Sequence, residues 1–310
     1  MKYLLLCSLL LLKSVVSLSQ QEFKSLSTGT REEITAIHVF SERTIIAVAA
    51  GGTIIRTTDA GLTWKPMASG TNEDLRAVSF VSQNIGYAAG MNQAILRTTD
   101  AGTNWERMPF NSTNFHFLDI YFTDSNTGFL AVSNGKILRT TNAGNSWDTV
   151  YKNNDQFITS FHFINELTGF ATAGGGNSEN GYGLLLKTTD GGKSWNKAGT
   201  SLNVTVTAVC MVTDNIIYAT AYDGLILKST DAGNNWSKTS IRDVRAFRDI
   251  VFTDNNNGYV AGDAASLYFT TDAGKSWNKI ALPISTDLCN IQEKNGHLYV
   301  AGTDGQFLKN

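Results

Sequence analysis

Charged residues occupy two adjacent positions of a strand that recurs along the chain, where they could bind an anionic group or assist hydrolysis. Arg76 and Arg248 take one position, and Asp119 and Asp249 take the next. Arginines bind anionic groups through charge-assisted hydrogen bonds, and two carboxylates on one channel are what a retaining glycosidase needs. Alternatively, these charges are solvated or pair with one another at the surface.

Further candidates lie near these charges. Arg242 and Arg245 precede Arg248 and extend the possible anion site. An aromatic cluster could form an adhesive rim for a protein partner, or several of its members could pack in the core. This cluster comprises Phe115, His116, Phe117, Phe157, Tyr182 and Tyr222. The glycine-rich insertion 174–183 either carries function or is merely tolerated.

The elements that position these residues follow from an eight-residue signature, Ser/Thr-x-Asp/Asn-x-Gly-x-x-Trp, that occurs six times. Its acidic or amide positions are Asp59, Asp100, Asn142, Asp190, Asp231 and Asp272, and its tryptophans are Trp64, Trp105, Trp147, Trp195, Trp236 and Trp277. Successive tryptophans are 41, 42, 48, 41 and 41 residues apart. A fixed period near forty residues indicates a radially repeated all-β fold.

The signature is expected to be structural. Its aspartate can accept hydrogen bonds from amides in a tight turn, its glycine supplies a positive φ, and its tryptophan packs between repeats. Calcium binding would need several oxygens on one ion, whereas each copy offers one carboxylate. We therefore expect no metal and no cofactor.

Each repeat predicts four short strands, as in residues 75–80, 86–90, 94–99 and those after Trp105. The first strand has seven starts, at Ile34, Leu75, Phe117, Ile158, Val206, Phe247 and Leu288, against six signatures. The seventh unit ends before its fourth strand. Residues 23–30 resemble residues 64–71 one period later, so they are expected to supply that strand. The prediction is an all-β, seven-bladed propeller of four-stranded antiparallel blades, closed by its N-terminal strand.

The predicted blades sort the loops onto two faces. The signature turns share one face with the turns between first and second strands. The opposite face carries the remaining loops, and the candidate binding residues belong to it. A basic residue also precedes the signature aspartate or asparagine by three positions, at Arg56, Arg97, Arg139, Lys187 and Lys228. These residues either cap neighbouring blades or form a basic arc for a partner.

The N-terminal segment predicts export. Lys2, the apolar run 4–12 and the small residues near position 19 are typical of a signal peptide cut before Gln20, so the expected divisions are 1–19 and 20–310. The protein is then secreted or periplasmic, with no membrane span. Without Lys2 and Lys13 the chain has 23 basic and 27 acidic side chains and no basic block, which argues against nucleic acid. Cys210 and Cys289 fall on blades that are not neighbours, so no disulfide is expected.

The signature resembles the Asp-box, or bacterial neuraminidase repeat. The fuller unit, with Phe80, residues 86–90 and residues 95–100, resembles the seven-bladed propellers of the photosystem II stability and assembly factor family. The resemblance implies a non-catalytic scaffold, expected to be a monomer, that binds a protein partner. The alternative is a secreted glycan-binding protein or a glycoside hydrolase of sialidase type. Sialidases, however, have six blades and an Arg-Ile-Pro motif that this chain lacks.

Overall fold

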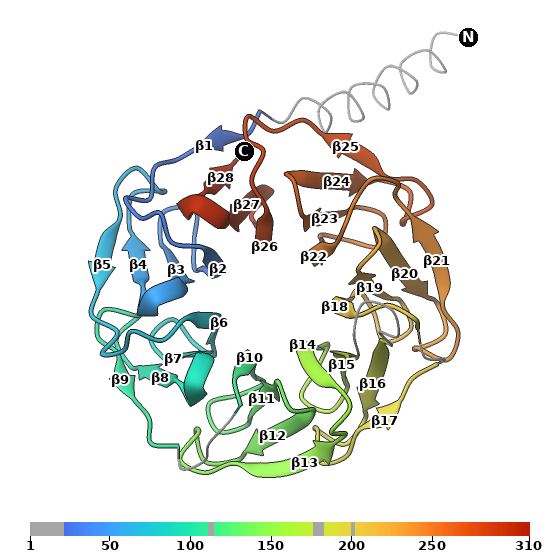
Figure 1. The fold of residues 1–310 in the computed structure, drawn as a ribbon, viewed down its shortest axis with the longest axis horizontal. Helices are drawn as coiled ribbons and strands as arrows, with labels where there is room; N and C mark the ends of the chain where they lie inside the picture. The colour runs from blue at the N-terminus through green and yellow to red at the C-terminus, as the bar shows by residue number, and fades with distance from the viewer. Residues whose placement is uncertain (1–21, 111–114, 176–182, 200–201) are drawn as a thin grey trace, which may run out of the picture.

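The computed structural model describes residues 22–110, 115–175, 183–199 and 202–310, which form seven four-stranded antiparallel sheets around a central channel (Figure 1). Each sheet is one blade, numbered here by its innermost strand. The blades are blade 1, β2 (Ile34–Val39), β3 (Ile45–Ala49), β4 (Ile54–Thr57) and β5 (Lys65–Met67); blade 2, β6 (Leu75–Phe80), β7 (Gly86–Gly90), β8 (Ile95–Thr98) and β9 (Glu106–Arg107); blade 3, β10 (Phe117–Phe122), β11 (Gly128–Val132), β12 (Lys136–Thr140) and β13 (Asp148–Lys152); blade 4, β14 (Phe157–Phe163), β15 (Gly169–Gly174), β16 (Leu184–Thr188) and β17 (Asn196–Lys197); blade 5, β18 (Val206–Met211), β19 (Ile217–Ala221), β20 (Leu225–Ser229) and β21 (Ser237–Ser240); blade 6, β22 (Phe247–Phe252), β23 (Gly258–Gly262), β24 (Ser266–Thr270) and β25 (Asn278–Ile280); and blade 7, β26 (Leu288–Lys294), β27 (His297–Gly302), β28 (Phe307–Lys309) and β1 (Lys24–Ser25).

The ring closes by joining the two ends of the chain, as predicted. Strand β1 pairs with β28, Lys24 opposite Lys309 and Ser25 opposite Leu308, so the N-terminal strand completes blade 7. The Phe23 side chain is 5% exposed and packs in the core between blades 6 and 7. Thr28 Oγ1 donates a 2.8 Å hydrogen bond to the carbonyl of Gly305, which fixes the chain as it leaves blade 7. The predicted fold and its closure are confirmed.

Apolar clusters fill the spaces between adjacent blades. The second strand of each blade is buried along its whole length in blades 1 to 6, as in the small-residue strand β7. Tryptophans of the signature lie at the outer part of these clusters; Trp64 contacts Phe307 of blade 7 with ring centroids 5.0 Å apart. Three one-turn 3₁₀ segments lie in loops, η1 (Ala50–Gly52), η2 (Met91–Gln93) and η3 (Thr303–Gly305). No described helix is long and apolar enough to cross a membrane.

The signature turns form a repeated hydrogen-bond network. Asp59 Oδ1 accepts hydrogen bonds from the Thr63 amide and the Thr57 hydroxyl, and Thr57 Oγ1 accepts one from the Gly61 amide. The Thr63 hydroxyl donates to Asp59 Oδ2, and with the Thr63 amide and the Thr57 hydroxyl it holds the pKa of the Asp59 carboxyl down at about 2. In the third copy Asn142 Oδ1 accepts the corresponding bonds. Gly61 has a φ of +87°, as expected, but Ala60 is also left-handed at +67°, which the sequence did not indicate.

The recurring basic residues cap the signature turn of the next blade. Arg56 Nε donates to the carbonyl of Ala101, Arg139 Nε to Gly191, Lys187 Nζ to Ala232 and Lys228 Nζ to Ala273. In blade 2 the Tyr87 hydroxyl contacts the equivalent carbonyl, of Ala143, and Arg97 lies over the Tyr87 ring. The structure therefore favours the capping interpretation over a basic arc for a partner.

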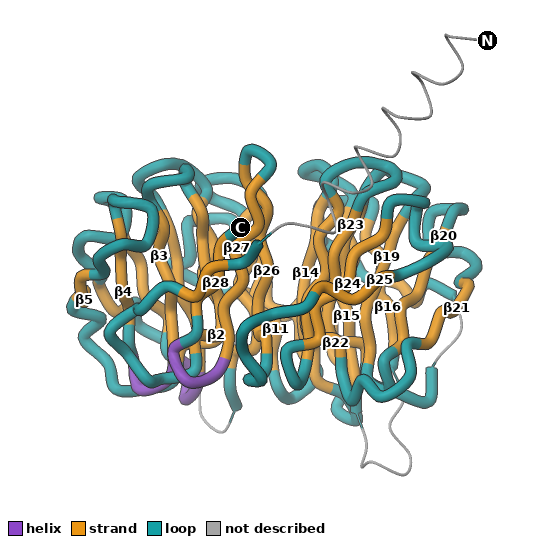
Figure 2. The backbone as a smooth tube through the Cα atoms, turned by 90° about the horizontal axis from the view of Figure 1, so that it is seen from above, coloured by secondary structure: helices purple, strands orange, loops and turns teal. Residues whose placement is uncertain are grey.

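The two faces of the ring follow the predicted division (Figure 2). The Ala60 amide of a signature turn bonds to the Arg43 carbonyl in the β2–β3 turn, so these turns share one face. On the other face, the Gly51 amide in the β3–β4 turn bonds to Asp74 in the loop that enters blade 2. We call this second face the mouth face, because it holds the candidate site.

Candidate functional site at the channel mouth

A β-bulge near the start of every inner strand builds the candidate site. The pairing register shifts at the second residue of β2, β6, β10, β18, β22 and β26, and at the third residue of β14. A bulge redirects a side chain out of the regular alternation. The bulged residues lie around the channel; they are Thr35, Arg76, Leu118, Thr159, Thr207, Arg248 and Cys289. This bulge ring lines a cavity of about 210 Å³.

Arg76 is held by two carboxylates. Its guanidinium lies 3.7 Å from Glu33 Oε2 and 3.5 Å from Asp74 Oδ2. Asp74 is itself positioned by the Gly51 amide, which donates to its other oxygen at 2.8 Å. Glu33 also accepts a 3.4 Å hydrogen bond from the Cys289 thiol, whose pKa is raised to about 12 by burial and by Glu33. The thiol is therefore a protonated donor and not a nucleophile.

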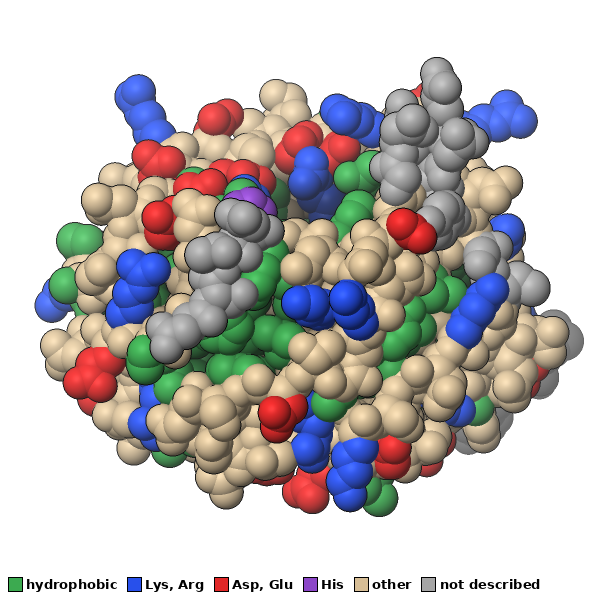
Figure 3. Space-filling model, turned by 60° about the horizontal axis from the view of Figure 1, so that its bottom comes forward, with side chains coloured by type: hydrophobic (Ala, Val, Ile, Leu, Met, Phe, Trp, Pro, Cys, Tyr) green, Lys and Arg blue, Asp and Glu red, His purple; other side chains and the backbone are tan. Residues whose placement is uncertain are grey.

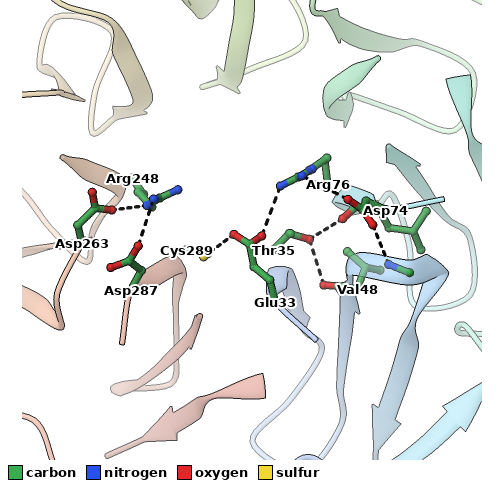
Figure 4. Close-up of polar contacts among 11 residues, drawn as sticks. Glu33, Thr35, Val48, Asp74, Arg76, Arg248, Asp263, Asp287 and Cys289 are labelled. Atoms are coloured by element: carbon green, nitrogen blue, oxygen red, sulfur yellow. Dashed lines mark hydrogen bonds and ion pairs between the residues drawn. The ribbon is translucent and has the colours of Figure 1, made fainter. Parts of the chain in front are cut away.

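Arg248 is held in the same way across blades 6 and 7. Its Nε contacts Asp263 Oδ1, and its Nη2 lies 3.4 Å from Asp287 Oδ2. The Ala264 amide donates to the other oxygen of Asp287 at 2.9 Å. Figure 4 shows Arg76 and Arg248 reaching the mouth from opposite sides, with Glu33 and Cys289 between them. Both arginines thus form ion pairs with neighbouring carboxylates, as one of the two interpretations expected.

Neutral side chains complete the cavity on the side of blades 3 to 5. They are Leu118, Phe157, Thr159, Thr205, Thr207 and Tyr222. The Thr159 and Thr207 hydroxyls donate to the carbonyls of Val206 and Phe247, each at the start of the next inner strand. Thr35 does the same to Leu75. These threonines join neighbouring blades and keep acceptor lone pairs.

Asp119 and Asp249, the two carboxylates considered for hydrolysis, both bind the backbone of the next blade. Asp119 Oδ2 accepts from the Phe161 amide at 2.8 Å. Asp249 Oδ2 accepts from the Ile291 amide at 2.9 Å and from Asn290 Nδ2 at 2.6 Å. The two aspartates line the channel, as expected, and they also latch neighbouring inner strands together.

These latches predict a pH dependence of stability. Burial raises the pKa of Asp119 to about 7 and that of Asp249 to about 6, above the 3.8 of an exposed carboxyl. Between pH 4 and 7 the folded state holds protons that the unfolded state has released, so the free energy of unfolding falls as pH rises. The buried His38 and His162, whose pKa is lowered to about 4, act in the opposite direction below pH 6.5, so the contribution of Asp119 is read from a comparison. From pH 5 to pH 8 the melting temperature of wild type is expected to fall relative to that of Asp119→Asn. Equal differences in wild type, Asp119→Asn and the exposed control Asp214→Asn would contradict this account.

The other predicted site residues lie beside the cavity or outside the described residues. Arg242 and Arg245 are exposed on the loop between β21 and β22, and neither forms an ion pair with a described residue. Tyr222 is 48% exposed and forms a β-bridge with Ala246 of that loop. We call Tyr222, Arg242 and Arg245 the rim. Tyr182 and most of the insertion 174–183 lie outside the described residues.

The aromatic cluster is divided between core and surface. Phe115 and Phe117 are buried between blades 2 and 3, as one interpretation expected, and His116 Nδ1 accepts the Asn92 amide. Phe157 and Tyr222 line the cavity. His38 and His162, which share a position with Cys210, are packed: His38 contacts the rings of Phe40 and Phe80, and His162 Nδ1 accepts the Met211 amide. Burial lowers the pKa of both to about 4. Cys210 and Cys289 are free thiols, and no group of metal-binding side chains occurs among the described residues.

Sequence reasoning missed most of the mouth. The sequence analysis did not identify the carboxylates that hold the two arginines, Glu33, Asp74, Asp263 and Asp287. Each of them lies in a loop that enters an inner strand or follows a second strand. A signal was available: the residue after each predicted strand start is the bulged one, and alignment of the seven starts gives the whole ring.

Comparisons with known proteins agree with this architecture. A family model described as photosynthesis system II assembly factor YCF48 matches residues 15–113 and 111–240. A structure of YCF48 bound to a D1 peptide is similar, with a TM-score of 0.77 and 19% identity over 93% of this chain and 94% of that one. The structure of YCF48 from Cyanidioschyzon merolae has a TM-score of 0.74 and 21% identity, over 93% of this chain and 98% of that one. No curated protein sequence matches.

An enzyme also shares the fold. The GH74 xyloglucanase from Xanthomonas campestris has a TM-score of 0.70 and 14% identity, over 93% of this chain but only 53% of the enzyme. At these identities the structural likenesses show the propeller alone.

Proposed function

Since the chain belongs to the photosynthesis system II assembly factor YCF48 family, we propose that it is a non-catalytic scaffold that binds a polypeptide partner on its mouth face. The observation that carries this proposal is the rim, where the exposed Tyr222 pairs with the loop that carries Arg242 and Arg245, two exposed arginines without an ion pair to any described residue. Arginine and tyrosine are enriched among residues that dominate binding energy at protein interfaces. The similar YCF48 structure holds a D1 peptide, which supports a peptide as the ligand.

The chemistry of the mouth supports binding rather than catalysis. A retaining glycosidase needs two free carboxyl groups about 5 Å apart, one of them as nucleophile. Here Asp119 and Asp249 each accept two backbone amides, and Asp263 and Asp287 hold Arg248. We further propose export through the segment 1–19, so that the partner is met outside the cytoplasm as a membrane or envelope protein.

Selection from a phage-displayed library of random peptides tests the proposal. Wild type is expected to enrich related sequences, and Arg242→Ala/Arg245→Ala is expected to bind them about tenfold or more weakly, as loss of interface hot spots does. The control Arg43→Ala/Arg107→Ala removes the same charge from exposed positions elsewhere and should bind as wild type. Binding of the D1 peptide in the same assay would support a photosystem role. Failure to enrich any sequence, or equal binding by both double variants, would refute the rim as the peptide site.

A further inference from the structure

The mouth cavity carries charged groups of both signs, so it is better suited to a neutral ligand that forms hydrogen bonds than to an anion or a cation. Glu33 is the acidic residue that lines the cavity, and the two arginines of its lining each already contact two carboxylates. An incoming anion would therefore meet Glu33 and compete with four carboxylates for Arg76 and Arg248. An incoming cation would meet two guanidinium groups that reach into the mouth (Figure 4). Figure 3 likewise shows acidic and basic side chains side by side over the visible face. A neutral ligand with many hydroxyl groups avoids both conflicts.

The charged side retains hydrogen-bonding capacity. The contacts of Arg76 with Glu33 and Asp74 are 3.7 and 3.5 Å, longer than the roughly 2.7–2.9 Å of a direct charge-assisted hydrogen bond. Their N–H groups and oxygens can therefore bind a further partner. Carboxylate and guanidinium groups are planar and bind two neighbouring atoms at once. Vicinal hydroxyls of a sugar match that geometry, one as donor to Glu33 and the next as acceptor from Arg76.

The opposite wall is suited to the other half of a sugar. Phe157, Leu118 and Tyr222 present apolar surface on the side of blades 3 to 5. The face of an aromatic ring carries partial negative charge, so it attracts the C–H groups that line one face of a pyranose. The cavity of about 210 Å³ is smaller than the roughly 300–1,000 Å³ of pockets for drug-sized ligands, which limits the ligand to about one ring.

We propose that the channel mouth binds one neutral hexopyranose unit, with vicinal hydroxyls on Glu33 and Arg76 and its C–H face against Phe157. The site is independent of the rim's peptide binding, although Tyr222 borders both. One ring of this size gives weak affinity, roughly millimolar.

Saturation-transfer NMR with the methyl glycosides of glucose, galactose and mannose tests the site, alongside an array of neutral and acidic glycans. Wild type is expected to bind at least one neutral hexoside. Glu33→Gln removes the charged acceptor and Phe157→Ala removes the platform, and each is expected to weaken binding about fivefold to tenfold. The controls Glu166→Gln and Leu167→Ala change exposed residues of the β14–β15 turn on the opposite face and should bind as wild type.

Melting temperatures of all four variants show that loss of binding is not loss of fold. Absence of binding to every neutral hexoside, binding to acidic glycans alone, or unchanged affinity in both Glu33→Gln and Phe157→Ala would overturn the proposal. The peptide selection separates the two functions: Glu33→Gln should keep peptide binding, and Arg242→Ala/Arg245→Ala should keep hexoside binding.

Discussion

Replacing Phe23 by alanine is expected to lower the free energy of unfolding by about 3–5 kcal/mol, the usual cost of emptying a buried phenylalanine site. Phe23 anchors the strand that joins the two ends of the chain, and its side chain packs among residues such as Ile280 and Leu308. Strand β1 itself has only two ladder residues, so the anchor provides most of its attachment. Urea unfolding followed by tryptophan fluorescence measures the change.

The neighbouring residue supplies the control. Lys24 belongs to the same strand but is exposed, so Lys24→Ala should stay within about 0.5 kcal/mol of wild type. If Phe23→Ala were as stable as Lys24→Ala, the ring would not depend on closure by its N-terminal strand.

Replacing Asp249 by alanine is expected to cost about 3 kcal/mol or more, because it leaves buried donors without an acceptor. Asp249 accepts hydrogen bonds from the amides of Ile250 and Ile291 and from Asn290 Nδ2. Asn290 in turn accepts the Ile37 amide through its Oδ1, so one relay joins blades 6, 7 and 1 across the closing seam. Gln292 adds bonds to the same strand of blade 1.

Calorimetry of Asp249→Ala beside Asp214→Ala measures this cost, since Asp214 is exposed and its loss should be nearly neutral. Because Asp249 latches blades and is not part of the rim, Asp249→Ala at temperatures where it is folded should bind the selected peptide as wild type does. A stable variant that had lost peptide binding would show that Asp249 belongs to the binding site.

The fold could be predicted from sequence because its determinants are repeated. Six tryptophans at nearly constant spacing locate the signature turns, and the match of Phe23 to Trp64 one period later reveals the closing strand. Each copy reports on the same local structure, so an error in one copy is corrected by the others. The three prolines lie in or just after outer strands, where a missing amide is tolerated, as Pro66 in β5 shows.

The site was less predictable because it depends on differences between repeats. Arg76 and Arg248 were recognised as charged positions, but their partners come from loops of other segments, as Glu33 and Asp287 show. The bulged residue of an inner strand faces the channel, and the residue directly after it latches the neighbouring blade. These two roles are separated by a single position in the sequence. Asp119 and Asp249 line the channel as assigned, but the sequence did not indicate that their carboxylates also bind the next strand.

Hydrogen–deuterium exchange of the chain with and without its selected peptide tests the central claim most directly, because it shows which face the partner covers. The account predicts slower exchange at the amides of 222–225 and 241–248 on the mouth face, and unchanged exchange at the signature turns, for example 59–63. Protection confined to the signature turns would contradict the claim that this propeller binds its partner on the mouth face.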